Sequence, residues 1–166
     1  MFDIKIKESI NTLRVCSSEF IKFYKNNSLK NANIVSEEAL KCFDFIVNEI
    51  LRFRDDHREN VNFRNSDFQR SLGEDCGKMY QPANVTERQS IITTPILPNP
   101  NSDICFEKLI TKFKHREKRN MNFRIEADNS HIIIFSVKEF YSTPASIVEF
   151  DVQDFCQKAE NVAKYI

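Results

Sequence analysis

The chain has 166 residues, and its 24 Lys and Arg balance its 24 Asp and Glu, so the formal net charge is zero. This length suits one compact domain, or two small units that share a core. Neither of the two glycines, Gly73 and Gly77, fits a glycine-rich phosphate-binding loop, which excludes nucleotide-binding enzymes of that kind. The balanced charge also argues against a protein that packages nucleic acid in bulk, because such proteins carry a basic excess.

The five cysteines form an odd set without a C-x-x-C pair. Four of them lie within apolar patterns, where a free thiol behaves as a small buried hydrophobe. The first residues lack the apolar core of a signal peptide, and no apolar run approaches the roughly 20 residues that span a bilayer. We therefore expect a reduced, soluble, intracellular protein of the cytoplasm or nucleus, with no membrane partner.

Helical periodicity runs through residues 1–76. Apolar residues at steps of three and four predict an amphipathic helix over residues 4–26, in one piece or restarted at Ser17. Ser36 is a good N-cap for a second helix that continues towards Arg58. The apolar positions of this second helix cover more than one stripe, which is typical of a helix buried on several sides or against a partner. We therefore expect a helical unit that could depend on a partner.

Short elements and a polar stretch follow. Residues 61–63 are predicted as a brief extended piece, and residues 66–73 as a short helix that opens with a capping box and stops at a glycine. The composition shifts from Gly77 onward, because four prolines punctuate a polar stretch up to Ser102. We interpret residues 77–102 as a linker between two units.

The second half, residues 103–166, alternates between helical and strand patterns. A helix is predicted at residues 103–117 and a last helix after Asp151. Between them lie three predicted strands, at residues 121–125, 131–137 and 146–150. The predicted fold class is α+β, in which a helical N-terminal half precedes an α-β-β-β-α half with a small antiparallel sheet.

One cluster combines carboxylates with an imidazole, at residues 55–59 (Asp-Asp-His-Arg-Glu). A metal site or an acid–base site needs such groups to converge with a second set of ligands, and no metal-binding motif accompanies them. Charges at the end of an apolar helix are usually a solvated terminus. None of the three histidines forms a signature with a cysteine nucleophile either. We therefore predict a protein without catalytic residues, metal or cofactor.

The one local charge asymmetry lies at residues 112–124, where Glu117 is the only carboxylate. Such a segment could bind phosphates or an acidic partner. Alternatively, it is the polar face and exit of a helix, where Lys and Arg are favourable near the negative end of the dipole. The candidate binding residues are Lys112, Lys114, Arg116, Lys118, Arg119 and Arg124.

Residues 20–72 resemble a histone fold. Residues 35–50 are similar to the start of the long central helix in a nucleosomal histone and in CCAAT-binding transcription subunits. Residues 20–24 fall where the first helix of that family ends, and residues 62–69 resemble its second loop and the start of its third helix. The resemblance implies that the central helix is buried by pairing with a second histone-fold chain.

Residues 103–166 resemble, in the order of their elements, a double-stranded RNA-binding domain. Residues 157–164 are similar to the alanine-rich last helix of that family. Gln153 and Asp154 stand where the family has a lysine pair that clamps phosphate. For this half the resemblance implies contact with a protein more than binding of RNA.

The favoured interpretation is a non-catalytic protein-interaction module, a subunit of a chromatin or transcription assembly. Its candidate pairing residues are Phe43, Val47 and Ile50, and the basic segment would contact an acidic partner. The alternative is an RNA-binding protein that uses residues 112–124. A third and weaker interpretation is an enzyme built around residues 55–59.

Overall fold

The computed structural model describes the backbone of residues 2–166 and the side chains from residue 5 onward. The chain divides into two compact units. The helical unit comprises Met1–Leu72 and Phe155–Ile166, and the sheet unit comprises Gly73–Asp154. The fold class is α+β, as predicted. Among the described residues, no helix combines the length and apolarity needed to cross a bilayer.

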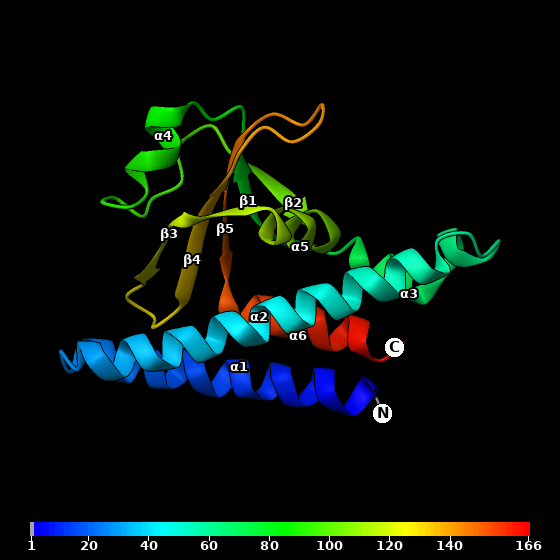
Figure 1. The fold of residues 1–166 in the computed structure, drawn as a ribbon, viewed down its shortest axis with the longest axis horizontal. Coiled ribbons are helices and arrows are strands. Elements are labelled where there is room, and N and C mark those ends of the chain that lie inside the picture. Colours follow the sequence, from blue (N-terminus) through cyan, green and yellow to red (C-terminus); the bar gives the residue numbers. More distant parts are fainter. Residues whose placement is uncertain (1) are drawn as a thin grey trace. The chain divides into compact units, whose positions relative to one another are not determined.

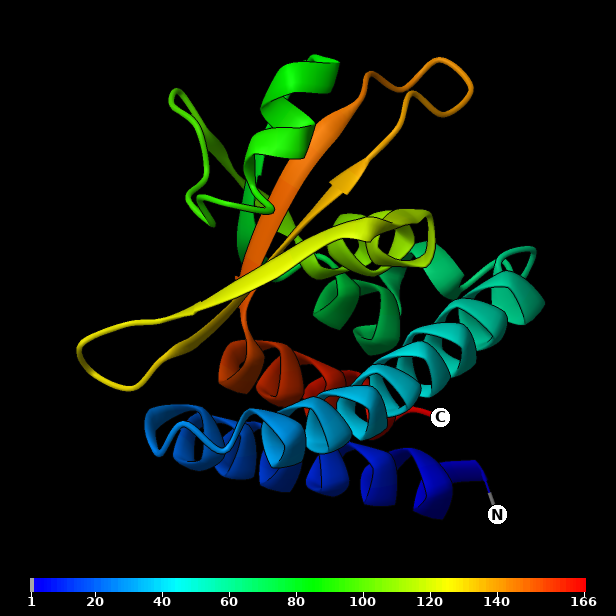
Figure 2. The same cartoon turned by 60° about the vertical axis from the view of Figure 1, so that its left-hand side comes forward.

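Two long helices form most of the helical unit. α1 (Phe2–Lys25) and α2 (Leu29–His57) run side by side as an antiparallel pair (Figures 1 and 2). The predicted periodicity of α1 is confirmed, because Ile6, Ile10 and Leu13 are at most 1% exposed. α2 begins seven residues before the predicted N-cap, Ser36, and the structure places the N-cap at Ser28.

The chain after α2 turns tightly. Residues 61–63 are not extended as predicted, because the amide of Phe63 donates to the carbonyl of Asn60 and a 3₁₀ helix, η1 (Phe63–Asn65), begins there. α3 (Asp67–Leu72) matches the predicted short helix within a residue at each end. Its N-terminus is capped by Ser66, whose Oγ accepts from the amide of Gln69 at 3.1 Å.

The last helix, α6 (Val152–Ala163), belongs mainly to the helical unit. The ring of Phe155 packs edge-on against Phe43 of α2, with 5.0 Å between the ring centres. Arg14 of α1 makes a bidentate pair with Glu160, at 2.9 and 3.1 Å. The predicted unit of residues 103–166 is therefore wrong at its end, because residues 155–166 belong to the helical unit, where Phe155 contacts α2 and Glu160 contacts α1.

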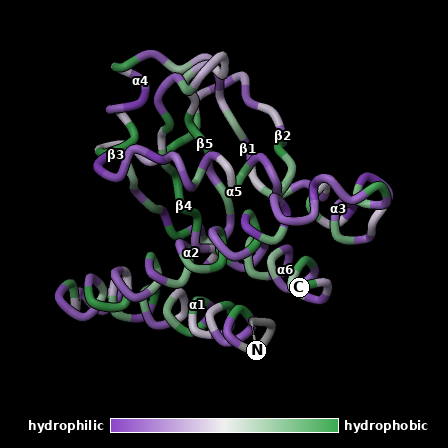
Figure 3. Tube along the Cα trace, turned by 45° about the vertical axis from the view of Figure 1, so that its right-hand side comes forward, coloured by the Kyte–Doolittle hydropathy of each residue, from purple (hydrophilic) through white to green (hydrophobic). Residues whose placement is uncertain are grey.

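The sheet unit contains five antiparallel strands in the order β2-β1-β5-β4-β3. The three predicted strands are present as β3 (Arg116–Ile125), β4 (His131–Val137) and β5 (Ser146–Asp151). Figure 3 shows β4 and β5 as mainly hydrophobic and β3 as mainly hydrophilic, in keeping with their central and edge positions.

The predicted linker is part of the sheet unit. β1 (Asp75–Tyr80) overlaps the start of residues 77–102, and α4 (Val85–Ser90) lies inside them. β2 (Ser102–Cys105) begins at their last residue and is followed by the helix α5 (Phe106–Lys114). The sequence did not predict β1, because its buried residues Cys76 and Met79 are three positions apart and do not alternate as in a regular strand. The register between β1 and β2 shifts in this interval, so β1 lacks the period of two that marks a strand.

Each face of the sheet has its own cover. On one face the ring of Phe113 of α5 packs edge-on against Phe135 and Phe150, with ring centres 5.3 and 6.1 Å apart. Ile134 is adjacent to Phe135 in β4 and therefore points to the opposite face. There Ile134 and Ile147 pack with Ala83, Ile91 and Leu97. We call this second face the α4 face, and the segment of residues 83–97 its cover.

We expect Phe155→Ala to lower the free energy of unfolding by about 3–5 kcal/mol, because it deletes a ring that is fully buried. Tyr165→Ala is the matched control, since Tyr165 lies near the same chain end and is 44% exposed. Urea denaturation followed by circular dichroism measures the free energy of unfolding of both variants. Equal stability of the two variants would contradict the packing of α6.

Gly77→Ala should cost at least about 2 kcal/mol, because Gly77 has φ +91° and strain of this kind is expensive for other residues. A Cβ at this position would also lie 2.5 Å from the carbonyl oxygen of Glu149. Gly73→Ala serves as the control, since Gly73 is exposed and has no positive φ. Thermal denaturation compares the stability of the two variants. An unchanged stability of Gly77→Ala would contradict the irregular backbone that the register shift between β1 and β2 places at Gly77.

Candidate functional site

The three predicted pairing residues lie in the interior of the protein. Phe43, Val47 and Ile50 are 3%, 1% and 0% exposed. Their spacing of four and three residues puts them on one side of α2, and Phe155 covers part of that side. The structure therefore gives these residues a place in the core, and their predicted role as partner contacts does not hold here.

The cluster at residues 55–59 is exposed at the end of α2. Asp55 pairs with Arg54 at 2.8 Å and with Arg58 at 3.7 Å. His57 stacks on Phe53, and its Nδ1 lies 2.8 Å from the carbonyl oxygen of Phe53. Within the part of the chain that the structure describes, no group of three His, Cys, Asp or Glu side chains could hold a metal ion.

The predicted basic segment is divided by the fold. Three of its six candidates make internal contacts. Lys112 donates to Ser146 Oγ at 3.0 Å, and Arg124 pairs with Glu149. The guanidinium of Arg116 lies 4.1 Å from the centre of the Phe113 ring. Burial, and to a smaller extent Lys108, lowers the pKa of Lys112. Lys114, Lys118 and Arg119 are exposed.

A bulge in β3 sets the position of Lys118 and Arg119. Arg116 pairs with Val137 and Met121 with Phe135, so residues 117–120 stand opposite a single residue of β4. These four residues are all polar and offer no alternation of apolar side chains that would keep them in the ladder. Bulges of this kind turn side chains away from their regular directions.

The bulge forms one wall of a pocket of about 510 Å³. α4 contributes to its lining, and so does Lys138 just after β4. We call it the basic pocket, because four cations line it against one carboxylate. Its lining residues are Val85, Arg88, Gln89, Glu117, Lys118, Arg119, Asn120 and Lys138.

The single carboxylate of the basic pocket, Glu117, is neutralised by an arginine of the same pocket. Glu117 accepts hydrogen bonds from Arg88 Nε at 3.1 Å and from the hydroxyl of Ser136. Arg88 also donates to the carbonyl of Ala83 at 2.8 Å, which fixes its guanidinium. Because both charges of this pair are mostly buried, the exposed charge of the pocket comes from Lys118, Arg119 and Lys138.

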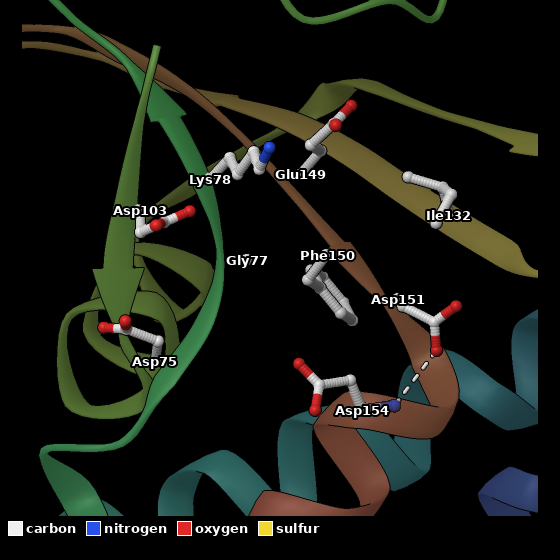
Figure 4. Close-up of a pocket in the computed structure, with 9 residues that line it drawn as sticks. All are labelled: Asp75, Gly77, Lys78, Asp103, Ile132, Glu149, Phe150, Asp151 and Asp154. Atoms are coloured by element: carbon white, nitrogen blue, oxygen red, sulfur yellow. Dashed lines mark hydrogen bonds between the residues drawn. The ribbon is translucent and has the colours of Figure 1, made fainter.

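A second pocket, of about 330 Å³, has the opposite charge. Figure 4 shows Asp75 and Asp103 on its β1–β2 side and Asp151 and Asp154 near the start of α6. Asp151 accepts from the amide of Asp154 at 3.0 Å and so caps α6. We call it the acidic pocket. Its lining residues are Asp75, Gly77, Lys78, Asp103, Ile132, Glu149, Phe150, Asp151 and Asp154.

Both pockets open on the α4 face. Lys78 pairs with Glu149, which in turn pairs with Ile134, so these residues share one face of the sheet. Ser136 is two positions from Ile134 on the same strand and therefore points to the same side, where its hydroxyl meets Glu117. Two charged pockets thus lie on one face, with the apolar cover beside them.

The sequence pointed to only part of this site. Lys118 and Arg119 were among the predicted candidates, whereas Arg88 and Lys138 are remote in sequence and only the fold brings them near. A signal for α4 was present, because Asn84 and Glu87 form a capping box. The carboxylates of the acidic pocket are scattered over four elements and have no pattern in the sequence.

His131 is a buried titratable group of the sheet unit. It is 9% exposed, and its ring meets Phe123 edge-on, with 6.0 Å between the centres. Burial lowers the pKa of His131 to about 4, although Asp151 acts in the opposite direction. The imidazole is therefore neutral in the folded protein at neutral pH.

Comparisons with protein-family models, with curated proteins and with solved structures found no match to this chain.

We predict that stability falls as the pH drops from 6.5 to 4, because the unfolded chain binds a proton at His131 before the folded chain does. Full protonation of this group would cost about 3 kcal/mol. Denaturation midpoints measured across this range should fall less steeply in His131→Gln than in the native sequence. Parallel pH profiles for the two proteins would refute the assignment.

Proposed function

We propose that this protein is a non-catalytic interaction module that binds an acidic partner protein through the basic pocket. The observation that carries the proposal is the convergence of Arg88, Lys118, Arg119 and Lys138, from three separate parts of the chain, on one pocket. The only carboxylate there is paired internally. A pocket with this charge attracts acidic groups, and it accelerates and orients their docking.

The balance of charge supports a protein as the partner more than a nucleic acid. A nucleic-acid strand carries a phosphate at every nucleotide, and its affinity rises with the number of phosphates neutralised. Three exposed cations, Lys118, Arg119 and Lys138, offer few such contacts. The acidic pocket on the same face would also repel a strand that extended past the basic pocket.

The proposed setting is a chromatin or transcription assembly, and its support is the histone-like resemblance of residues 20–72. That resemblance implies a long central helix, and α2 has 29 residues. The pairing surface implied by the resemblance would have to lie outside Phe43, Val47 and Ile50, since these side chains are buried.

RNA binding is the second candidate function, and one loop favours it. Tyr141 follows Lys138 in the β4–β5 loop, is 91% exposed and has φ 51°. An exposed ring close in sequence to a cation of the pocket offers a platform for base stacking. In this alternative the same pocket would hold phosphates of single-stranded RNA.

We expect a fluorescent glutamate-rich peptide to bind the protein, and Lys118→Glu with Arg119→Glu to weaken that binding at least about tenfold, because the peptide then meets like charge. The matched control is Lys108→Glu with Lys114→Glu, which changes the net charge equally at exposed positions of α5. Fluorescence anisotropy measures the affinities. Equal weakening by both double variants would contradict a local site.

The same titration with a single-stranded RNA oligonucleotide distinguishes the second candidate. RNA binding would be tighter than peptide binding, would fall with salt by a slope of about −0.7 per phosphate contact, and would weaken in Tyr141→Ala. Our proposal predicts instead that the peptide binds more tightly than the RNA and that Tyr141→Ala has no effect on peptide affinity.

A further inference from the structure

The two pockets carry charge of opposite sign. The basic pocket has three exposed cations once Arg88 and Glu117 are paired. In the acidic pocket Glu149 is paired with Arg124, and the other charged lining residues are four aspartates and Lys78. Cations therefore predominate in the lining of one pocket and carboxylates in the lining of the other.

The cover joins the two pockets along the α4 face. At one end Val85 and Arg88 line the basic pocket. At the other end the carbonyl of Pro95 accepts from Arg124, the arginine that pairs with Glu149 of the acidic pocket. Asn122 of β3 binds the middle of the cover to the sheet, because its side-chain amide donates to the carbonyls of Ile91 and Ile92 at 2.9 and 2.8 Å.

The cover exposes apolar side chains between the two charged regions. Val85, Ile92 and Ile96 are 58%, 47% and 62% exposed. Apolar residues gathered in one short segment and flanked by charge resemble a docking surface, in which an apolar centre is surrounded by a polar rim. The α4 face thus has a basic region, an apolar region and an acidic region.

We propose that two copies of this chain associate through their α4 faces, with the basic pocket of each copy against the acidic pocket of the other. A two-fold axis through the cover places apolar residues against apolar residues and brings each charged pocket to its opposite, so the surface is complementary to itself. This inference rests on the proposed function and names the acidic partner as a second copy.

The association should be electrostatic in its dependence on salt. Sedimentation velocity of the full chain at low ionic strength should show a reversible dimer that forms as concentration rises. At an ionic strength of about 1 M, where charges are screened over about 3 Å, the dimer should dissociate largely. A chain that stays monomeric at every concentration in low salt would overturn the proposal.

Charge reversal of either pocket should abolish the dimer. The first variant is Lys118→Glu with Arg119→Glu, and the second is Asp75→Lys with Asp103→Lys. All four side chains are exposed, so the fold should be retained and circular dichroism verifies it. Each variant should dimerise at least about tenfold more weakly than the native chain, since like charges then face each other.

A mixture of the two variants tests the two-fold arrangement directly. In a mixed dimer the reversed basic pocket of the first variant faces the reversed acidic pocket of the second, and the two native pockets face each other. Mixing should therefore restore a dimer that neither variant forms alone. Failure of the mixture to dimerise would overturn the two-fold arrangement.

Two further arms separate this inference from the proposed function. Asp56→Lys with Glu59→Lys makes the same charge change at exposed positions of the helical unit and should leave dimerisation unchanged. The Asp75 and Asp103 variant retains the basic pocket and should still bind the glutamate-rich peptide. If peptide binding persists while the native chain stays monomeric, only the dimer fails. If the peptide does not bind either, the proposed function fails with it.

Discussion

The pairing of β4 with β5 is the constraint on which the sheet unit depends. These two central strands bury side chains on both faces, with Phe135 and Phe150 on one and Ile134 and Ile147 on the other. A sheet buried on both faces needs a layer of other residues over each of them. α5 supplies one layer, and the segment that contains α4 supplies the other. The proline-containing stretch is therefore held on the sheet and does not serve as a free linker.

The elements with a regular side-chain period could be predicted from the sequence. α1 and α2 have apolar residues at helical spacing, and β4 is a run of β-branched and aromatic residues. Their types were predicted because burial follows that period along one element. The start of α2 was misplaced because Ser36 has good capping chemistry, yet seven helical residues precede it.

The remaining elements depend on contacts that are distant in the sequence. β1 is recognisable only through its pairing with β2 and β5, because its buried residues are three apart. α6 has the periodicity of any amphipathic helix, and nothing in that pattern indicates whether it packs with α2 or with the sheet. The same holds for the pockets: Arg88 and Glu117 are 29 positions apart, and only the fold joins them.

The neutral chain carries two regions of strong local charge, the basic pocket and the acidic pocket. Each lies beside an irregularity in the strand ladder: Gly77 in β1 borders the acidic pocket, and residues 117–120 of β3 border the basic one. A regular strand alternates its side chains between the two faces, which would divide a run such as Glu-Lys-Arg-Asn equally. The bulge in β3 breaks that alternation, and the neighbouring cations Lys118 and Arg119 line the same pocket. The zero net charge of the chain therefore coexists with local regions of opposite sign, and the strand period of two fails at the bulge where Lys118 and Arg119 come together.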